Sequence, residues 1–332
     1  MKRGKGVVLF SGGLDSLLAA RVLMDQDLEI IGFHCILPFV APDIRADELG
    51  PVKLAGQIHL PVETHRCGSE YIEIIRNPQH GYGKHANPCI DCHIYFIQKA
   101  AEYMRETHAD FVATGEVIGQ RPMSQMKHTM NHIEKVTGLN GRLVRPLSGK
   151  LLKPTQPEID GIINRDLLYE INGRSRKEQF DLAKKYNILE YSSPSGGCLF
   201  TDTNIAKRVQ DILLWHNDVQ PLDFYLLTIG RHFRINEKAK AIVSRNENEN
   251  NELIKYKDTS DYFFIPDFRG PDAYVKGSIS EDEVTEIGTI IRRYGKPEPG
   301  DSFISVFRNG TLVQKITPAI SIPDEKLDQL RI

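Results

Sequence analysis

The sequence lacks any run near the roughly 18 consecutive apolar residues that a membrane-spanning helix needs. It also lacks a signal-peptide pattern, so we expect a cytoplasmic protein. Cysteine is scarce and odd in number, 5 in 332 residues, which argues against a disulfide framework. Neither charge sign dominates, because 42 Lys and Arg face 44 Asp and Glu, and this excludes nucleic-acid recognition by overall basicity. The length favours two or more domains.

The most informative segment is residues 7–16, Val-Val-Leu-Phe-Ser-Gly-Gly-Leu-Asp-Ser. Its apolar start is typical of a buried strand, and residues 17–24 continue with helical spacing. A strand that turns through Ser-Gly-Gly into a helix leaves backbone N–H groups free at the positive end of the helix dipole, where phosphate binds. This is not a Walker A loop, because the Gly-Lys-Ser/Thr ending is missing.

The residue types of this loop suit a phosphate site. Two glycines remove Cβ atoms that would block close approach, and two serines offer hydroxyl donors. Asp15 can cap the helix or help to hold Mg²⁺. The predicted phosphate-binding residues are Ser11, Gly12, Gly13, Leu14, Asp15 and Ser16.

Strand and helix alternate through the first part of the chain. After the first pair we expect strands at 28–37, 61–66 and 110–114, and helices at 46–59 (shortened by Pro51) and 90–107. The alternation predicts an α/β fold with a doubly wound parallel sheet, in which ligands bind at the carboxyl ends of the strands. The loops expected at that edge are 11–16, 34–38 and 115–125.

The chain changes character twice after residue 144. Residues 145–203 are proline-punctuated, and we expect a helical adaptor packed on the first domain, 1–144. Residues 204–332 predict a smaller α+β domain. Its expected helices are 204–215 and 281–294, and its expected strands are 224–231, 241–244, 263–266 and 302–308.

Three cysteines stand in positions that indicate chemistry. Cys89-Ile-Asp-Cys92 opens the helix expected at 90–107, and Cys198 follows two glycines much later in the chain. A C-x-x-C pair at a helix start places two thiols side by side, and the helix N-terminus lowers their pKa. Cys198 can complete a three-thiolate site. We interpret Cys67, and the side chain of Cys35, as structural.

The residues alone leave the thiol chemistry open. Three thiolates can hold a 4Fe–4S cluster with one iron free to bind a small ligand. Structural zinc needs a fourth ligand, which His85 or His93 could supply. The thiols could instead form a redox relay with Cys198 as third partner, or be three unrelated buried cysteines.

These segments together resemble the PP-loop ATP pyrophosphatases and, among them, the tRNA thiouridine synthases. The Ser-Gly-Gly-x-Asp-Ser loop at 11–16 is that of the wider family, and Asn-Pro-x-x-x-Cys at 87–92 is similar to the 2-thiouridylases. Thr-Gly-Glu at 114–116, with Gly-Gln after it, is similar to the 4-thiouridine synthases. Cys89 departs from the persulfide-dependent 2-thiouridylases and is similar to iron–sulfur-dependent thiolation enzymes.

The resemblance implies an adenine nucleotide alpha hydrolase-like fold and an ATP-dependent sulfurtransferase. The enzyme would adenylate a uridine carbonyl oxygen of tRNA or another RNA, with ATP and Mg²⁺, and replace the oxygen with sulfur. The adenine would lie near His34 and Cys35, and the ribose or α-phosphate near Gly115 and Gln120.

Sulfur would come from hydrosulfide or from a cysteine desulfurase. In the version that the resemblance favours, hydrosulfide binds the open iron of a 4Fe–4S cluster held by Cys89, Cys92 and Cys198. In the second version, Cys198 carries a persulfide and Cys92 resolves it as a disulfide.

The C-terminal region resembles the RNA-binding domain of the NFACT proteins. Its basic stretch is expected to contact phosphates, although a solvated basic face is the simpler interpretation. The predicted RNA contacts are Arg231, Arg234, Lys238, Lys240 and Arg245. A second basic group in and just before the adaptor, which could face the same RNA, consists of Arg142, Arg145, Lys150, Lys153, Arg174, Arg176 and Lys177.

Two further classes compete with a thiouridine synthase. A PP-loop amidating ligase would use ammonia in place of sulfur and has no use for three placed cysteines. A non-enzymatic RNA-binding factor would carry the loop as a vestige. The sequence does not fix the RNA, the nucleotide or the oligomeric state, for which a homodimer is one candidate.

Overall fold

The structure is a computed structural model that describes residues 4–192, 198–297, 302–319 and 321–332. The chain divides into two compact units, Met1–Thr201 and Asp202–Ile332. Residues 145–201 therefore lie in the same unit as the N-terminal sheet, and the three-part division stays a prediction. No helix in the described ranges is long and apolar enough to cross a membrane.

A five-stranded parallel sheet forms the centre of the first unit in the part that the structure describes, with the order β3-β2-β1-β4-β5. The strands are β1 (Lys5–Leu9), β2 (Glu29–Ile36), β3 (Val62–Arg66), β4 (Phe111–Ala113) and β5 (Leu143–Val144). The order reverses between β1 and β4, the place where ligands bind in such sheets. The predicted doubly wound fold is confirmed.

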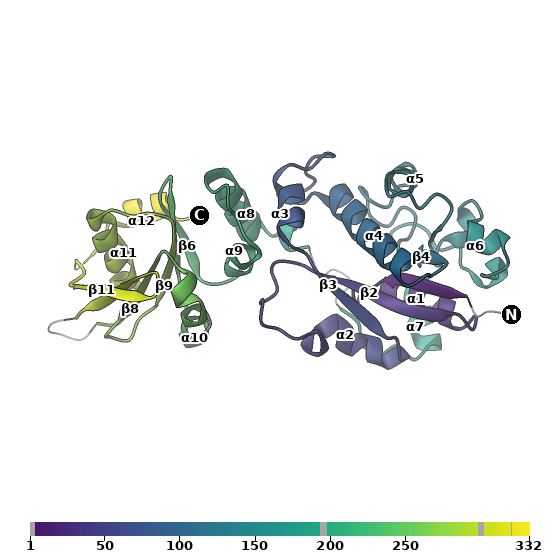
Figure 1. Ribbon diagram of the computed structural model, residues 1–332, viewed down its shortest axis with the longest axis horizontal. Coiled ribbons are helices and arrows are strands. Elements are labelled where there is room, and N and C mark those ends of the chain that lie inside the picture. The colour runs from purple at the N-terminus through teal and green to yellow at the C-terminus, as the bar shows by residue number, and fades with distance from the viewer. Residues whose placement is uncertain (1–3, 193–197, 298–301, 320) are drawn as a thin grey trace. The chain divides into compact units, whose positions relative to one another are not determined.

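Helices cover both faces of this sheet (Figure 1). α1 (Leu14–Met24), α2 (Gly50–Ala55) and α7 (Lys177–Lys185) pack on one face. α4 (Cys89–Glu106) and α5 (Lys127–Val136) pack on the other. β1 is buried on both faces, because Val8 joins the first of these cores and Val7 the second, which accounts for its unbroken apolar sequence.

Short elements complete the first unit. They are η1 (Ala46–Glu48), η2 (Gly56–Ile58), α3 (Ser69–Arg76), η3 (Gly149–Leu151), α6 (Gln156–Ile159), η4 (Arg165–Leu167) and η5 (Leu199–Thr201). The helix expected at 46–59 is broken into η1, α2 and η2. Pro51 lies in the first turn of α2, where its missing N–H costs nothing, so it starts a helix there.

The second unit is α+β, as predicted. Its described residues form a six-stranded antiparallel sheet of order β11-β10-β8-β9-β7-β6. The strands are β6 (Arg231–Asn236), β7 (Ala239–Val243), β8 (Tyr262–Pro266), β9 (Ala273–Lys276), β10 (Ile304–Arg308) and β11 (Thr311–Ile316). One face packs on α11 (Glu281–Tyr294) and α12 (Asp324–Leu330), and the other on α9 (Pro221–Leu226) and α10 (Glu247–Leu253). α8 (Thr203–Trp215) and η6 (Ile254–Thr259) complete the unit.

The strand expected at 224–231 is wrong. Residues 221–226 form α9, and β6 starts only at Arg231. Pro221 and a capping box between Gln220 and Asp223 start this helix. A short apolar run fits a buried helix as well as a strand, and here only the capping residues distinguish the two.

Candidate nucleotide and thiol site

The Ser-Gly-Gly loop closes tightly between β1 and α1. Ser16 Oγ donates a hydrogen bond to the Gly13 carbonyl at 2.8 Å, and the Ser11 N–H donates to Ser16 Oγ at 3.3 Å. Gly12 has φ +72°, and a Cβ there would lie 2.9 Å from Pro51 Cα. Only glycine fits this position, so the loop requires the residue that the sequence supplies.

Asp15 is held by a chain of two amides. Gln120 Nε2 donates to Asp15 Oδ2 at 2.6 Å, and Gln179 Nε2 donates to Gln120 Oε1 at 2.8 Å. Burial raises the pKa of Asp15. Its Oδ1 is buried and has no hydrogen-bond partner in the described residues. A divalent cation would satisfy this oxygen, so Asp15 fits the Mg²⁺ role. Gly13, not Asp15, occupies the N-cap of α1.

The loop after β4 packs directly on the Ser-Gly-Gly loop. A Cβ on Gly115 would lie 2.6 Å from the carbonyl carbon and oxygen of Asp15. This distance is far below van der Waals contact, so Gly115 permits the approach of the two loops. The close approach explains a glycine at the end of this strand.

A cavity of about 700 Å³ lies where these loops meet. Its wall includes Ser11, Asp15 and Ser16 from the first loop, His34 and Cys35 from β2, and the segment after β4. The remaining wall is mostly apolar, as is usual for a ligand site.

His34 is neutral in this wall. Its Nδ1 lies 2.8 Å from the Phe10 carbonyl, so Nδ1 carries the proton and donates. Burial lowers the pKa of His34. The ring therefore offers an uncharged edge, which suits a nucleobase better than a phosphate.

The predicted nucleotide residues divide into two groups in the described wall. Those that line the cavity are Ser11, Asp15, Ser16, His34, Cys35 and Gly115. Those outside the wall are Gly12, Gly13, Leu14 and Gln120. Leu14 packs in the core, and Gln120 acts through Asp15.

All three cysteines lie near the start of α4. Cys89 is the first residue of α4, and its thiol lies 3.5 Å from Ser124 Oγ. The Cys198 thiol donates to Asn87 Oδ1 at 3.8 Å. Burial raises the pKa of Cys198, and the charge of Cys89 adds to the rise. The two thiols are therefore near neighbours, although they are far apart in the chain.

The segment before and after Cys198 joins the thiols to the nucleotide loop. The Ser192 N–H donates to the Gly12 carbonyl at 2.9 Å, and the Ala86 N–H donates to the Phe200 carbonyl at 3.2 Å. The Gly-Gly pair before Cys198 lies outside the described residues, which omit 193–197. The described ends of this segment bind next to the glycine loop on one side and next to the Cys89 segment on the other.

Cys92 has a different environment. It is buried, and its thiol lies 3.1 Å from the Tyr71 hydroxyl. Burial raises the pKa of Cys92, and the charges of Cys198 and Cys89 raise it further. Within the described ranges no group of three or more His, Cys, Asp or Glu side chains is placed to hold a metal ion. The three thiols approach one another, but as placed they do not form a ligand set.

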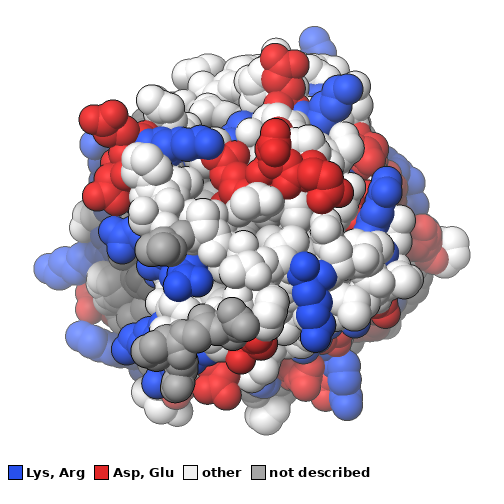
Figure 2. Space-filling model, turned by 90° about the vertical axis from the view of Figure 1, so that its left-hand side faces the viewer, with Lys and Arg blue, Asp and Glu red and all other residues white. Residues whose placement is uncertain are grey.

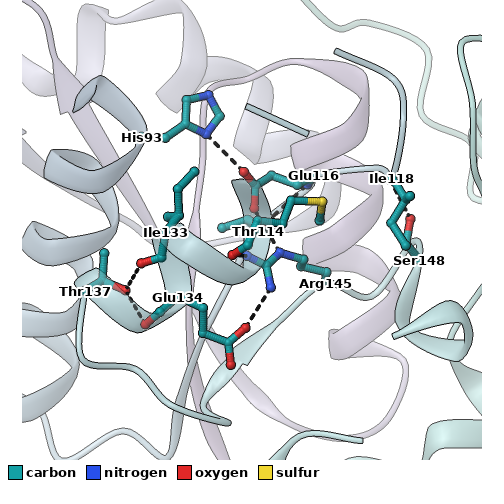
Figure 3. Close-up of polar contacts among 10 residues, drawn as sticks. His93, Thr114, Glu116, Ile118, Ile133, Glu134, Thr137, Arg145 and Ser148 are labelled. Carbon is teal, nitrogen blue, oxygen red and sulfur yellow. Dashed lines mark hydrogen bonds and ion pairs between the residues drawn. The ribbon is translucent and has the colours of Figure 1, made fainter. Parts of the chain in front are cut away.

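A buried ion-pair network reaches the cavity wall through His93 and Glu116 (Figure 3). His93 Nδ1 lies 3.0 Å from Glu116 Oε1. Arg145 Nε donates to Glu116 Oε2 at 3.0 Å, and Arg145 Nη1 donates to Glu134 Oε2 at 3.0 Å. Arg145 is 3 % exposed, so it cannot face RNA together with the other cations of its predicted group.

The network sets the charges of its members. Burial alone would raise the pKa of Glu116, but Arg145 and His93 overcome it and lower the pKa to about 2. Burial would lower the pKa of His93, but Cys89 and Glu116 raise it to about 9. Burial would also raise the pKa of Cys89, and its hydrogen bond with His93 lowers it. Cys89 is therefore the thiol best prepared to be a thiolate.

The sequence suggests His93 only as a zinc ligand and gives no link between His93 and Glu116. The sequence does indicate that Cys89 and His93 lie together, because they are four positions apart at the start of one helix and so share a face. No local sequence pattern predicts that Glu116, in the segment after β4, contacts His93, because the fold brings these two segments together.

The five predicted RNA contacts in the second unit are mostly engaged inside it. Lys240 is 2 % exposed and pairs with Asp211 at 3.0 Å, and burial lowers its pKa to about 8. Arg234 pairs with the same carboxylate. Arg231 donates to the Ser244 carbonyl and Arg245 pairs with Glu249. Lys238 is exposed and has no side-chain partner among the described residues.

The surface at the end of the second unit carries both charge signs (Figure 2). Lys and Arg side chains lie singly around this face, and a group of acidic side chains lies in its upper half. No continuous basic patch covers the described part of this face.

Two known families match parts of this chain. Residues 1–151 match the family model described as Thiamine biosynthesis protein (ThiI), and residues 230–330 match that of the NFACT protein RNA binding domain. The predicted resemblance is confirmed. The first match covers the glycine loop, the C-x-x-C segment and the Thr-Gly-Glu element of the first unit, and the second covers the sheet of the second unit.

Curated relatives that match the first unit are tRNA-specific 2-thiouridylases. The chain is 23 % identical over 223 residues to that of Listeria monocytogenes serotype 4b, covering 62 % of this chain and 55 % of the relative. It is 33 % identical over 112 residues to that of Desulfosudis oleivorans, covering 32 % of this chain and 30 % of the relative. The chain thus spans about half the length of the first of these relatives.

Two solved structures are similar. One is a 4-thiouridine synthetase–RNA complex with bound ATP, with TM-score 0.34 and 21 % identity, covering 56 % of this chain and 52 % of that one. The other is a predicted subunit of tRNA methyltransferase from Methanocaldococcus jannaschii, with TM-score 0.36 and 16 % identity, covering 55 % of this chain and 76 % of that one.

Proposed function

We propose that this protein is an ATP-dependent sulfurtransferase that thiolates a uridine of tRNA or another RNA. The observation that carries the proposal is the cavity of about 700 Å³, whose wall includes Ser11, Asp15 and Ser16 of the glycine loop. The same wall includes His93, the partner of Cys89, and Leu199, which follows Cys198, although the three thiols themselves lie outside the described wall. A nucleotide site next to thiols is what an adenylation followed by sulfur transfer requires. The matches to 2-thiouridylases and to the ThiI family support the same chemistry.

In the first step the uridine carbonyl oxygen forms a bond to the α-phosphorus of ATP. The bond to the β-phosphate oxygen breaks, and pyrophosphate leaves with the electron pair. The loop at 11–16 would bind the departing pyrophosphate through backbone N–H groups and the Ser11 and Ser16 hydroxyls. Asp15 would hold Mg²⁺ through its unpartnered Oδ1. His34 and Cys35 at the end of β2 would line the adenine side.

In the second step a sulfur nucleophile adds to the activated carbon, and AMP leaves with the C–O electron pair. When the nucleophile is hydrosulfide, its proton is released and the product is a C=S group. We propose Cys89, Cys92 and Cys198 as the thiols that manage this sulfur. Since no three-ligand group is placed for a metal in the described residues, we derive no step through a 4Fe–4S cluster, although three thiols suit one in number and chemistry.

The persulfide version uses the same residues. A persulfide on Cys198 would give its terminal sulfur to the RNA carbon, and a second thiol would attack the remaining sulfur to leave a disulfide. The lowered pKa of Cys89 makes it a better attacking thiol than the buried Cys92. We therefore place Cys89 beside Cys92 as a resolving thiol in this version.

We propose that the second unit binds the RNA. Its match to the NFACT RNA-binding domain supports this partner. Because Lys240 and Arg234 are engaged with Asp211, their role is to hold α8 against the sheet, and Lys238 is the best placed of the five predicted cations to reach a phosphate.

The test is thiolation of RNA from cells that lack the protein, with ATP, Mg²⁺ and sulfide, followed by mass spectrometry of the nucleosides. We expect a thiolated uridine and AMP in equal amounts, and neither with ATP whose α,β-bridging oxygen is replaced by methylene. Cys198→Ala should abolish thiolation, whereas the matched variant Cys67→Ala, at a buried cysteine that we interpret as structural, should retain it. Full activity of Cys198→Ala would instead favour an amidating ligase.

Anaerobic purification with iron and sulfide analysis separates the two sulfur routes. Several irons per chain, lost together in Cys89→Ala, Cys92→Ala and Cys198→Ala, would establish the cluster. An iron-free protein that thiolates RNA would dismiss it, and a Cys89–Cys198 or Cys92–Cys198 disulfide after one turnover would establish the persulfide route.

A further inference from the structure

Arg121 occupies the junction between the nucleotide loop and the thiols. It lies in the segment after β4 and lines the cavity wall together with Asp15, Ser16 and Glu116. It is the only Lys or Arg in the described part of that wall. Its side chain is exposed, and in the described residues it has no ion-pair or hydrogen-bond partner. An unpaired guanidinium facing a nucleotide cavity is available to a ligand.

The charge of Arg121 acts on both sides of the junction. Burial is the largest influence on the pKa of Asp15, Cys89 and Cys198, and at each of them the charge of Arg121 acts the other way and lowers the pKa. The guanidinium therefore lies within electrostatic reach of the Mg²⁺ carboxylate and of two thiols. His93 is a second cation in the described wall, but it is paired with Glu116, which leaves Arg121 as the unpaired one.

The neighbouring cations are already engaged or face elsewhere. Arg145 is buried between Glu116 and Glu134. Arg176 also lowers the pKa of Asp15 but does not line the described wall. A nucleotide that places its phosphates in the glycine loop and its base near β2 therefore meets one free guanidinium on the side of the thiols.

We propose that Arg121 is a catalytic residue that binds the α-phosphate between the glycine loop and the thiols. This inference rests on the proposed function. The α-phosphate lies between the base and the pyrophosphate, and it is the group that the RNA carbonyl must reach. A planar guanidinium binds two phosphate oxygens at once, so Arg121 would stabilise the charge on the α-phosphate when pyrophosphate leaves and again when AMP leaves.

Binding of AMP and adenosine to the full chain tests the contact without any RNA. We expect Arg121→Ala to weaken AMP binding roughly 10- to 100-fold, as loss of a charge-assisted bidentate contact does, and to leave adenosine binding unchanged. Arg105→Ala is the matched control, since Arg105 is exposed in the last turn of α4, about 24 Å along the helix from Cys89. The melting temperature of Arg121→Ala should equal that of the wild type because the side chain has no partner.

Turnover with RNA tests the catalytic role. We expect Arg121→Ala to lower kcat for AMP formation roughly 10²- to 10³-fold, with Arg121→Lys intermediate and Arg121→Gly partly rescued by methylguanidine. Unchanged AMP affinity would overturn the proposal, as would a rise in KM for RNA alone, which would assign Arg121 to an RNA phosphate. AMP binding that depends on Arg121 in a protein that thiolates no RNA would sustain the contact and refute the proposed function.

Discussion

Replacement of Arg145 by methionine should strongly destabilise the first unit. The guanidinium is 3 % exposed and donates to Glu116, Glu134 and the Met130 carbonyl, each at 3.0 Å. Methionine fills the space but leaves the Glu116 carboxylate buried without its cation. Breaking a buried pair from one side costs about 3–5 kcal/mol. For a unit of this size that corresponds to a fall in Tm of roughly 6–20 °C.

The same network makes stability depend on pH. The pKa of Glu116 is lowered from 4.5 to about 2, so its contribution is complete above pH 4.5 and is lost as the pH falls towards 2. The lowered pKa of Glu116 corresponds to about 3 kcal/mol of unfolding free energy. In Arg145→Met the pKa of Glu116 should rise, since burial then meets less opposition, so the loss of stability between pH 4.5 and pH 2 should be smaller than in the wild type.

Denaturant unfolding between pH 2 and 8 measures both effects. Arg45→Met is the control, because Arg45 pairs with Asp47 on the surface, with side chains 73 % and 64 % exposed, and should cost about 0.5 kcal/mol or less. A loss below about 1 kcal/mol for Arg145→Met at pH 7, or an acid loss of stability as large in the variant as in the wild type, would refute the reasoning.

Three further predictions follow from the site. Gly115→Ala should lose about 1–3 kcal/mol of unfolding free energy and weaken AMP binding, because its Cβ would meet the Asp15 backbone at 2.6 Å. The control Gly56→Ala adds a Cβ that meets nothing within 4 Å, so it should leave AMP binding and stability unchanged or stabilise the protein slightly. Equal stability and equal AMP binding in the two variants would contradict the close packing of Gly115 on Asp15. Gln120→Leu should raise the Mg²⁺ concentration needed for AMP formation roughly 10- to 100-fold, since Gln120 holds Asp15, and an unchanged Mg²⁺ titration would exclude this role. Lys238→Ala should reduce the slope of log affinity for RNA against log salt concentration by about 1 and leave Tm unchanged. Lys240→Met should lower Tm, because it leaves part of the Asp211 carboxylate unpaired. If Lys238→Ala leaves the slope unchanged, Lys238 does not contact RNA.

Local sequence was sufficient where one segment makes its own structure. The strand, glycine turn and helix at 5–24 form as expected, because the turn needs glycine and the strand is buried on both faces. The helix 281–294 has the predicted bounds, since Ser280 and Glu283 form a capping box at its start. The strand expected at 224–231 failed because a short apolar run has no period that separates helix from strand.

Partners distant in sequence could not be predicted in detail. Arg145 looked like one more cation of a basic group, and only the pairing of β5 with β4 brings it to Glu116. Lys240 lies between Ala239 and Ala241 in β7, and this alternation predicts that Lys240 faces solvent. In the structure, Asp211 of α8 lies on that face and pairs with Lys240. The surroundings of Cys198 likewise come from Asn87, a contact 111 positions apart.

The hydrogen bond from Ser192 to the Gly12 carbonyl has a consequence for how sulfur is supplied. Cys198 follows Ser192 closely in the chain, and covalent geometry limits the span between them to about 20 Å in any conformation. In the persulfide version of the proposed function, Cys198 therefore stays within about 20 Å of Ser192 while that hydrogen bond holds. A protein that donates sulfur to Cys198 would then have to dock on this unit, whereas free hydrosulfide would not.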